Sequence, residues 1–183
     1  MSPIPLSVYV TPFVNEAEKW SCDKAREALN VVNKIWSNAK VRFAISNCFV
    51  DEPLDMDRKE RANDQRLLNA LSRRHPADNF VHVYLVNPIA NLNAGGASYI
   101  DSDPEPASFV QRYDNAMANG RAWAHELGHL MSLDHVEIDY ANERQAALLV
   151  KNLMTKGLGV GTDLTAEQIA QARASMLVKR FGG

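Results

Sequence analysis

The sequence is poor in cysteine, with only Cys22 and Cys48 among 183 residues. A chain of this length can bury most of its apolar surface on folding, so it needs no covalent staples. The surrounding patterns place Cys22 in a helix and Cys48 in a strand. We expect two unpaired, buried thiols in a reducing compartment, with a Cys22–Cys48 disulfide as the less favoured alternative.

The sequence also lacks any apolar run long enough to span a bilayer. Its first residues, MSPIPLSVYVTPF, show no basic segment followed by an apolar stretch, which is the pattern of a secretory signal. We therefore expect a soluble chain without membrane contact, either cytoplasmic or exported without a cleavable signal.

An excess of charge of one sign is missing as well. The chain carries 20 basic and 22 acidic side chains, for a formal net charge of -2, and no basic tract. Proteins that bind nucleic acid usually show a basic patch or stripe, so the sequence predicts no nucleic-acid partner. The hydrophobic share of 46% is typical of an ordinary globular domain. We expect one domain over residues 1–183, and a monomer.

Apolar periodicity and capping residues predict a mixed set of strands and helices. The predicted strands cover 4–10, 41–50, 80–86, 97–100 and 108–114. The predicted helices cover 21–39, 57–76 and 117–133, and a last helix begins with a capping pattern at Thr165. Residues 80–86 are almost all apolar, which predicts a strand at the sheet centre. The stretch from 134 to 150 shows no clear pattern.

The segment HELGHLMSLDH, residues 125–135, holds three of the five histidines. Residues four apart share a helix face, so His125 and His129 can point at one ion. Glu126 lies beside the first ligand, where its carboxylate can reach a water held on the metal and act as general base. A catalytic zinc site needs a third protein ligand, and His135 supplies it if the helix ends near Ser132 and the chain turns back.

These residues resemble the metzincin zinc metallopeptidases, whose pattern is HExxHxxGxxH followed by a Met-turn. The three histidines and Glu126 match that pattern, and NLMT, with Met154, is similar to the Met-turn. The resemblance implies an α+β fold. It comprises a twisted mixed sheet with a backing helix and an active-site helix, an upper lobe over about 1–132, and a small lower lobe over about 133–183 with a terminal helix.

One residue departs from that pattern, because Ser132 stands where the family has glycine. The glycine allows a left-handed turn toward the third ligand, and a non-glycine residue costs about 1 to 2 kcal/mol there. Metal binding supplies much more free energy than that strain removes. We therefore expect His135 to remain a ligand.

The resemblance also implies one catalytic zinc ion held by the three histidines, with Met154 as a hydrophobic base beneath it. Substrate would lie extended along an exposed edge strand, which we place at Gly96, Ala97, Ser98, Tyr99 and Ile100 because its glycine lets another backbone approach. Residues 155–162 would form a wall of the pocket for the side chain that follows the cut. No tyrosine follows Met154 closely, so a switch tyrosine is not indicated.

Three functions follow from these features. The favoured one is a zinc-dependent endopeptidase acting on an extended peptide or protein through a zinc-bound water and Glu126. The first alternative is an aminopeptidase or deacylase acting on a small amide with the same zinc-bound water. The second alternative is a zinc-stabilised binding module without turnover, which the retained Glu126 disfavours because a structural zinc site prefers a fourth protein ligand.

The remaining histidines, His75 and His82, are expected to serve structural roles. A second, structural zinc held by these two side chains and Asp78 is the less favoured alternative. Two acidic stretches, 51–57 and 101–106, lack a recognisable calcium-binding loop and are expected to be solvated turns.

Overall fold

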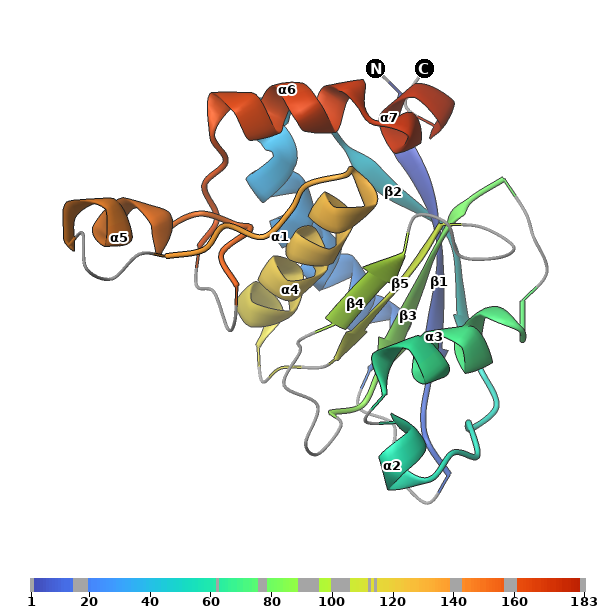
Figure 1. Ribbon diagram of the computed structural model, residues 1–183. Helices are drawn as coiled ribbons and strands as arrows, with labels where there is room; N and C mark the ends of the chain where they lie inside the picture. Colours follow the sequence, from blue (N-terminus) through green and yellow to red (C-terminus); the bar gives the residue numbers. More distant parts are fainter. Residues whose placement is uncertain are drawn as a thin grey trace.

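The computed structural model describes most of the chain and arranges it as one five-stranded sheet with helices on both faces (Figure 1). The described residues are 2–14, 20–61, 63–75, 79–88, 96–99, 106–111, 113, 115–138, 143–156 and 161–181. The strands are β1 (Ile4–Thr11), β2 (Phe43–Val50), β3 (Val81–Val86), β4 (Gly96–Tyr99) and β5 (Ala107–Gln111). The helices are α1 (Cys22–Trp36), the 3-10 turn η1 (Ser37–Ala39), α2 (Arg58–Arg61), α3 (Asp64–Ser72), α4 (Ala116–Leu130), α5 (Glu143–Leu149), α6 (Ala166–Ala174) and α7 (Met176–Phe181).

The sheet has the strand order β2-β1-β3-β5-β4. The first four strands in that order run parallel, and β4 pairs antiparallel with β5 at the edge. All six residues of β3 are buried, because helices cover both faces of the sheet at its centre. The mixed sheet, with its central strand and its edge strand, confirms the predicted fold class.

Each face of the sheet has its own apolar core. On one face α1 and α4 pack against side chains such as Val8, Val83 and Val110. On the other face α3 contributes leucines that pack against Tyr84 and Phe109. Strand residues alternate between the two cores, as the two-residue period of a strand requires.

Helix α4 is held by close contact with α1, its backing helix. A Cβ atom at Gly120 would lie 2.4 Å from Cβ of Val31 and 2.8 Å from the carbonyl oxygen of Ala28, so only glycine allows this approach. The indole N–H of Trp36 donates to the carbonyl of Ala124 at 3.2 Å. These contacts fix both the height and the rotation of α4 on the sheet.

The end of α4 is a left-handed turn at Ser132, whose φ is 65°. The N–H of Ser132 donates to the carbonyl of His129 at 2.8 Å, and the N–H of Leu133 donates to that of Gly128 at 3.0 Å. This pair of bonds is the Schellman motif, which normally places glycine at the left-handed position. Ser132 therefore makes the turn that the family pattern assigns to glycine.

Helix α6 joins two distant parts of the chain. Thr165 and Gln168 form the predicted capping box at its start. Further along, the Gln171 side chain donates to the carbonyl of Ser132, and the guanidinium of Arg173 donates to the carbonyl of Ala39 at 2.7 Å. One helix thus binds the turn that ends α4 and the turn that follows α1.

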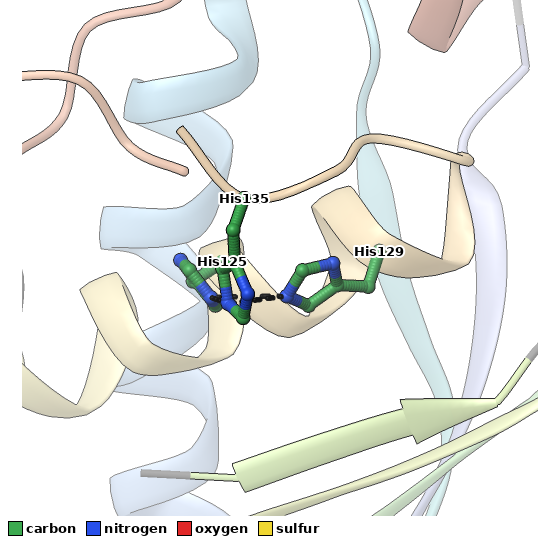
Figure 2. Close-up of side chains that lie close together, drawn as sticks. All are labelled: His125, His129 and His135. Carbon is green, nitrogen blue, oxygen red and sulfur yellow. Dashed lines mark hydrogen bonds between the residues drawn. The ribbon is translucent and has the colours of Figure 1, made fainter. Parts of the chain in front are cut away.

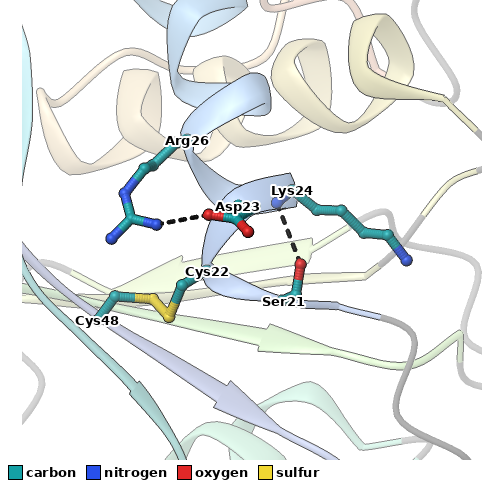
Figure 3. Close-up of a disulfide and its surroundings, with 6 residues drawn as sticks. All are labelled: Ser21, Cys22, Asp23, Lys24, Arg26 and Cys48. Carbon is teal, nitrogen blue, oxygen red and sulfur yellow. Dashed lines mark hydrogen bonds and ion pairs between the residues drawn. A yellow bond between two sulfur atoms is a disulfide. The ribbon is translucent and has the colours of Figure 1, made fainter.

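The expectation of two free thiols was wrong, because Cys22 and Cys48 form a disulfide (Figure 3). The first turn of α1 packs over β2, which brings the two Cα atoms to 5.9 Å, within the range of a disulfide. Because the two cysteines are 26 residues apart, no local sequence pattern indicated that they would be in contact. Disulfides persist in oxidising compartments and are rare in reducing ones.

Two predicted segments differ from the structure. The single helix expected over 57–76 is divided into α2 and α3, because the Asn63 side chain accepts a hydrogen bond from the N–H of Arg66 and caps a new helix. The stretch 134–150, which showed no clear pattern, contains α5. Among the described residues, no helix is both long and apolar enough to cross a membrane.

Removing the disulfide should lower the free energy of unfolding. A cross-link between residues 26 positions apart restricts the unfolded chain by about 3 to 4 kcal/mol in the loop-closure account. The Cys22→Ser, Cys48→Ser double variant should lose that amount in urea unfolding, and wild type with reductant should match it. Detection of two titratable thiols in the native, oxidised protein would contradict the pairing.

Replacing Ser132 by glycine should stabilise the protein by about 1 kcal/mol, because glycine enters the left-handed region without steric cost. The backbone bonds of the turn do not involve the serine side chain. Ser132→Val, with a β-branched side chain, should destabilise the turn instead. Urea unfolding of both variants with and without zinc checks this, and equal stability of the two variants would refute the strain.

Candidate metal centre

Three histidines converge at the end of α4 (Figure 2). His125 and His129 lie one turn apart on α4, and His135 reaches them from the segment after the Ser132 turn. The Nε2 atoms of His125 and His129 are 3.1 Å apart, and each lies 3.2 Å from Nε2 of His135. Among the described residues this is the one group of three side chains that could hold a metal ion.

The second ring nitrogens fix the orientation of two of these imidazoles. Nδ1 of His125 lies 2.8 Å from the carbonyl oxygen of Leu153, and Nδ1 of His129 lies 2.8 Å from that of Leu133. A carbonyl only accepts, so each Nδ1 carries the proton and each Nε2 presents a lone pair. Such contacts hold metal-binding imidazoles in one tautomer.

The spacing of the three nitrogens fits zinc. A tetrahedral zinc ion with Zn–N distances of about 2.0 to 2.1 Å separates its ligand nitrogens by about 3.3 Å. The two Nε2 atoms of α4 both present lone pairs, so they cannot hydrogen-bond to each other at 3.1 Å. A shared cation would satisfy both of them together with His135.

The three imidazoles are held in the neutral form that binds metal. Burial lowers the pKa of His125 from 6.5 to about 4; the hydrogen bond to Leu153 opposes this and the neighbouring imidazoles add to it. Burial also lowers the pKa of His129, against the hydrogen bond to Leu133. The pKa of His135 is lowered by burial and then by the charge of Lys156.

Glu126, the candidate general base, is buried, with 5% of its surface exposed. It faces β4, where the Ser98 hydroxyl lies 2.7 Å from Oε2 and 2.9 Å from the backbone carbonyl oxygen of Glu126 itself. Gly96 also faces the glutamate, and a Cβ there would lie 2.8 Å from Cγ of Glu126 and 2.4 Å from the carbonyl oxygen of Phe109. The edge strand and the carboxylate are therefore in direct contact.

Met154 is fully buried and packs beneath α4. A Cβ at Gly128 would lie 2.5 Å from its sulfur, so the glycine in HELGH makes room for the methionine. The Met154 carbonyl accepts from the N–H of Val136 at 2.8 Å, next to the third histidine. The segment around Met154 thus contacts His125 directly through the carbonyl of Leu153 and supports His135 through its neighbour Val136. The Met-turn assignment and the role of Met154 beneath a metal stay predictions.

The predicted edge strand lies at the edge of the sheet as β4, paired on one side with β5. Among the described residues no second strand pairs with its outer side, and an edge strand presents backbone N–H and C=O groups there to an added strand. Ile100 and residues 157–160 of the predicted pocket wall lie outside the described residues. Whether β4 binds substrate stays a prediction.

Sequence reasoning missed several residues of this site. No sequence pattern identified the backbone carbonyls of Leu133 and Leu153 as hydrogen-bond acceptors for the histidines, since every residue has a backbone carbonyl. Tyr113 was also missed; burial and then the negative charge of Glu126 raise its pKa, so its phenol stays protonated near the carboxylate. Asn119, one turn into α4, accepts from the Tyr113 N–H at 2.6 Å and holds that residue in place.

The other two histidines lie in β3 and after α3. His75 stacks on Tyr9 with ring centroids 3.6 Å apart, and its Nε2 lies 3.0 Å from a carboxylate oxygen of Asp51. Nδ1 of His82 lies 3.4 Å from the Tyr84 hydroxyl. These contacts agree with structural roles, and Asp78 of the alternative second zinc site lies outside the described residues.

No protein-family model matches the sequence, and no curated protein sequence does. Solved structures do resemble the fold. Archaemetzincin from Methanopyrus kandleri gives a TM-score of 0.59 at 13% identity, covering 99% of this chain and 97% of that chain. Metalloproteinase-II from Bacteroides fragilis gives 0.55 at 12% identity, covering 93% of this chain and 52% of that chain.

A chain from the structure of a chaperone-substrate complex gives a TM-score of 0.54 at 14% identity, covering 98% of this chain and 35% of that chain. The protein thus spans about half of the length of the Bacteroides metalloproteinase and about a third of this third chain. Identities this low show a shared fold alone. In its fold, the protein is therefore similar to archaemetzincin and to metalloproteinase-II over nearly all of its length.

Proposed function

We propose that the protein is a zinc-dependent endopeptidase that cleaves peptide bonds within an extended peptide or protein. The observation that carries the proposal is the triangle of three Nε2 atoms, 3.1 to 3.2 Å apart, with a buried glutamate next to the first ligand. Three protein ligands leave a coordination position open, as catalytic zinc sites do. The fold shared with a metalloproteinase supports the same reaction class.

The residues divide the chemistry among them. His125, His129 and His135 would hold a zinc ion, which supplies the Lewis acidity that activates water and polarises a carbonyl. Glu126 accepts a proton from the attacking water and returns it to the leaving amine, as general acid–base catalysis requires. Its burial beside β4 keeps this carboxylate out of bulk solvent and limits its movement.

The edge strand supports an endopeptidase over an enzyme that acts only on small amides. An extended peptide can add to the outer side of β4 through main-chain hydrogen bonds, which do not require a free terminus. Gly96 and Ser98 of the same strand contact Glu126, so a chain paired with β4 would lie next to the proposed base.

The metal-free protein should lose stability as the pH falls from 6.5 toward 4. Because burial lowers the pKa of His125 to about 4, only the unfolded chain binds a proton there in this window. Linkage then predicts about 2 kcal/mol less stability at pH 5 than at pH 7 from this residue. Urea unfolding checks the change, with the His125→Gln variant as a control that should lose less stability between the same two pH values because only His129 and His135 remain. A His125 titration near its ordinary pKa in NMR would contradict the prediction.

Glu126→Gln should keep the zinc and lose turnover by about 100- to 10,000-fold, because the amide cannot accept the proton. Elemental analysis would measure the zinc, and digestion of a peptide library read by mass spectrometry would measure cleavage. His135→Ala is the control that should lose both metal and activity. Cleavage by the Gln variant at the wild-type rate would disprove the assignment of the base.

The same digestion separates the candidate reactions. Cuts within peptides whose two ends are blocked would support an endopeptidase. Products released only from free amino termini, or only by deacylation, would refute the endopeptidase proposal in favour of action on a small amide. Zinc without any cleavage across the library would favour the binding module.

A further inference from the structure

We propose that Ser98 is a positioning residue for Glu126, and that its hydroxyl selects which carboxylate oxygen takes part in proton transfer. The inference rests on the proposed function, since it concerns the base of that reaction. It assigns a role to the Ser98 side chain that is separate from any role of the β4 backbone in binding substrate.

The hydroxyl of Ser98 has two acceptors on the same residue. It lies 2.7 Å from Oε2 of Glu126 and 2.9 Å from the Glu126 carbonyl oxygen. A hydroxyl has one proton, and an ionised acceptor gives the shorter and stronger bond. The Ser98 proton therefore points to Oε2, and the Glu126 carbonyl oxygen at 2.9 Å is the weaker, competing acceptor of the same proton.

The stem of Glu126 is confined by the same strand. Side chains alternate along a strand, so residues 96 and 98 share the face that looks toward α4. A Cβ at Gly96 would lie only 2.8 Å from Cγ and 3.0 Å from Cδ of Glu126, which shows how closely the stem approaches the strand. The backbone at Gly96 thus lies against the stem, while Ser98 holds one end of the carboxylate.

This arrangement makes the two carboxylate oxygens unequal. Oε2 accepts from Ser98 whether or not the carboxyl group is protonated, because either form can accept a hydrogen bond. The proton that Glu126 transfers is then carried by Oε1. This oxygen accepts the proton from the attacking water and passes it to the leaving amine. Without Ser98 the carboxylate would sample other orientations, and fewer molecules would hold the base in the reactive one.

The test compares Ser98→Ala with wild type on one peptide substrate. Loss of a hydrogen bond to a carboxylate should lower kcat by about 10- to 100-fold. KM and zinc affinity should stay within about twofold, because the β4 backbone and the three histidines are unchanged. Ser98→Thr, which keeps the hydroxyl, should restore most of kcat.

Ser108→Ala is the matched control. Ser108 lies opposite Ser98 in the β4–β5 ladder, is fully buried, and its hydroxyl has no hydrogen-bond partner among the described residues. Ser108→Ala makes the same serine-to-alanine change on the neighbouring strand, and it should leave kcat at the wild-type value. A wild-type kcat in Ser98→Ala would overturn the proposal. So would a joint loss of kcat, zinc affinity and thermal stability that threonine does not rescue, since a purely structural role predicts that result.

A binding measurement tests the same inference without turnover. A peptide hydroxamate offers a metal-chelating group whose proton-bearing atoms can reach an adjacent carboxylate. Calorimetry on the zinc-loaded protein should show that Ser98→Ala weakens this ligand by about tenfold when residue 126 is Glu, and by less than twofold in the Glu126→Gln background.

The two proposals fail in different ways. If wild type cleaves no peptide, the proposed function fails, and the hydroxamate cycle still decides whether Ser98 acts through Glu126. If wild type cleaves and the effects of the two substitutions on hydroxamate affinity are additive, the role of Ser98 fails while the proposed endopeptidase stands.

Discussion

The metal centre depends on a reversal of the chain within six residues. His125 and His129 share a helix face without any help from the rest of the fold, but two imidazoles make a weak site. His135 joins them only because α4 ends at Leu130 and Ser132 turns the backbone into the left-handed region. Several elements near the site either hold α4 before this turn or support the chain after it.

Support comes from both sides of the turn. Before it, the contact of Gly120 with α1 and the indole of Trp36 hold the helix that carries two of the histidines. After it, the Met154 carbonyl binds the backbone of Val136, and the Asn152 side chain accepts from the Met154 N–H at 2.9 Å. Asn152 in turn exchanges two amide hydrogen bonds with Gln168 of α6. Asn152, Met154 and Gln168 thus form a network of polar contacts next to the candidate metal centre.

Local patterns predicted much of this architecture. The apolar spacing in α1 matched its buried face, and the apolar run of β3 placed it at the sheet centre, because periodicity follows directly from which side chains are buried. The spacing in HELGHLMSLDH predicted that three histidines converge, and His125, His129 and His135 do lie together. The disulfide was mispredicted because the pairing depends on how α1 lies over β2. No short segment of the sequence indicates that arrangement. The Ser98 contact with Glu126 was missed for the same reason: it joins residues 28 positions apart.

The clamp formed by α6 links parts of the molecule that share no metal ligand. Gln171 binds the Ser132 carbonyl, and Arg173 binds the carbonyl of Ala39 at the end of the turn that follows the backing helix. A displacement of α6 would therefore act on both helix ends together. The helix thus connects the outer surface of the molecule to the turn that brings His135 to the other two histidines.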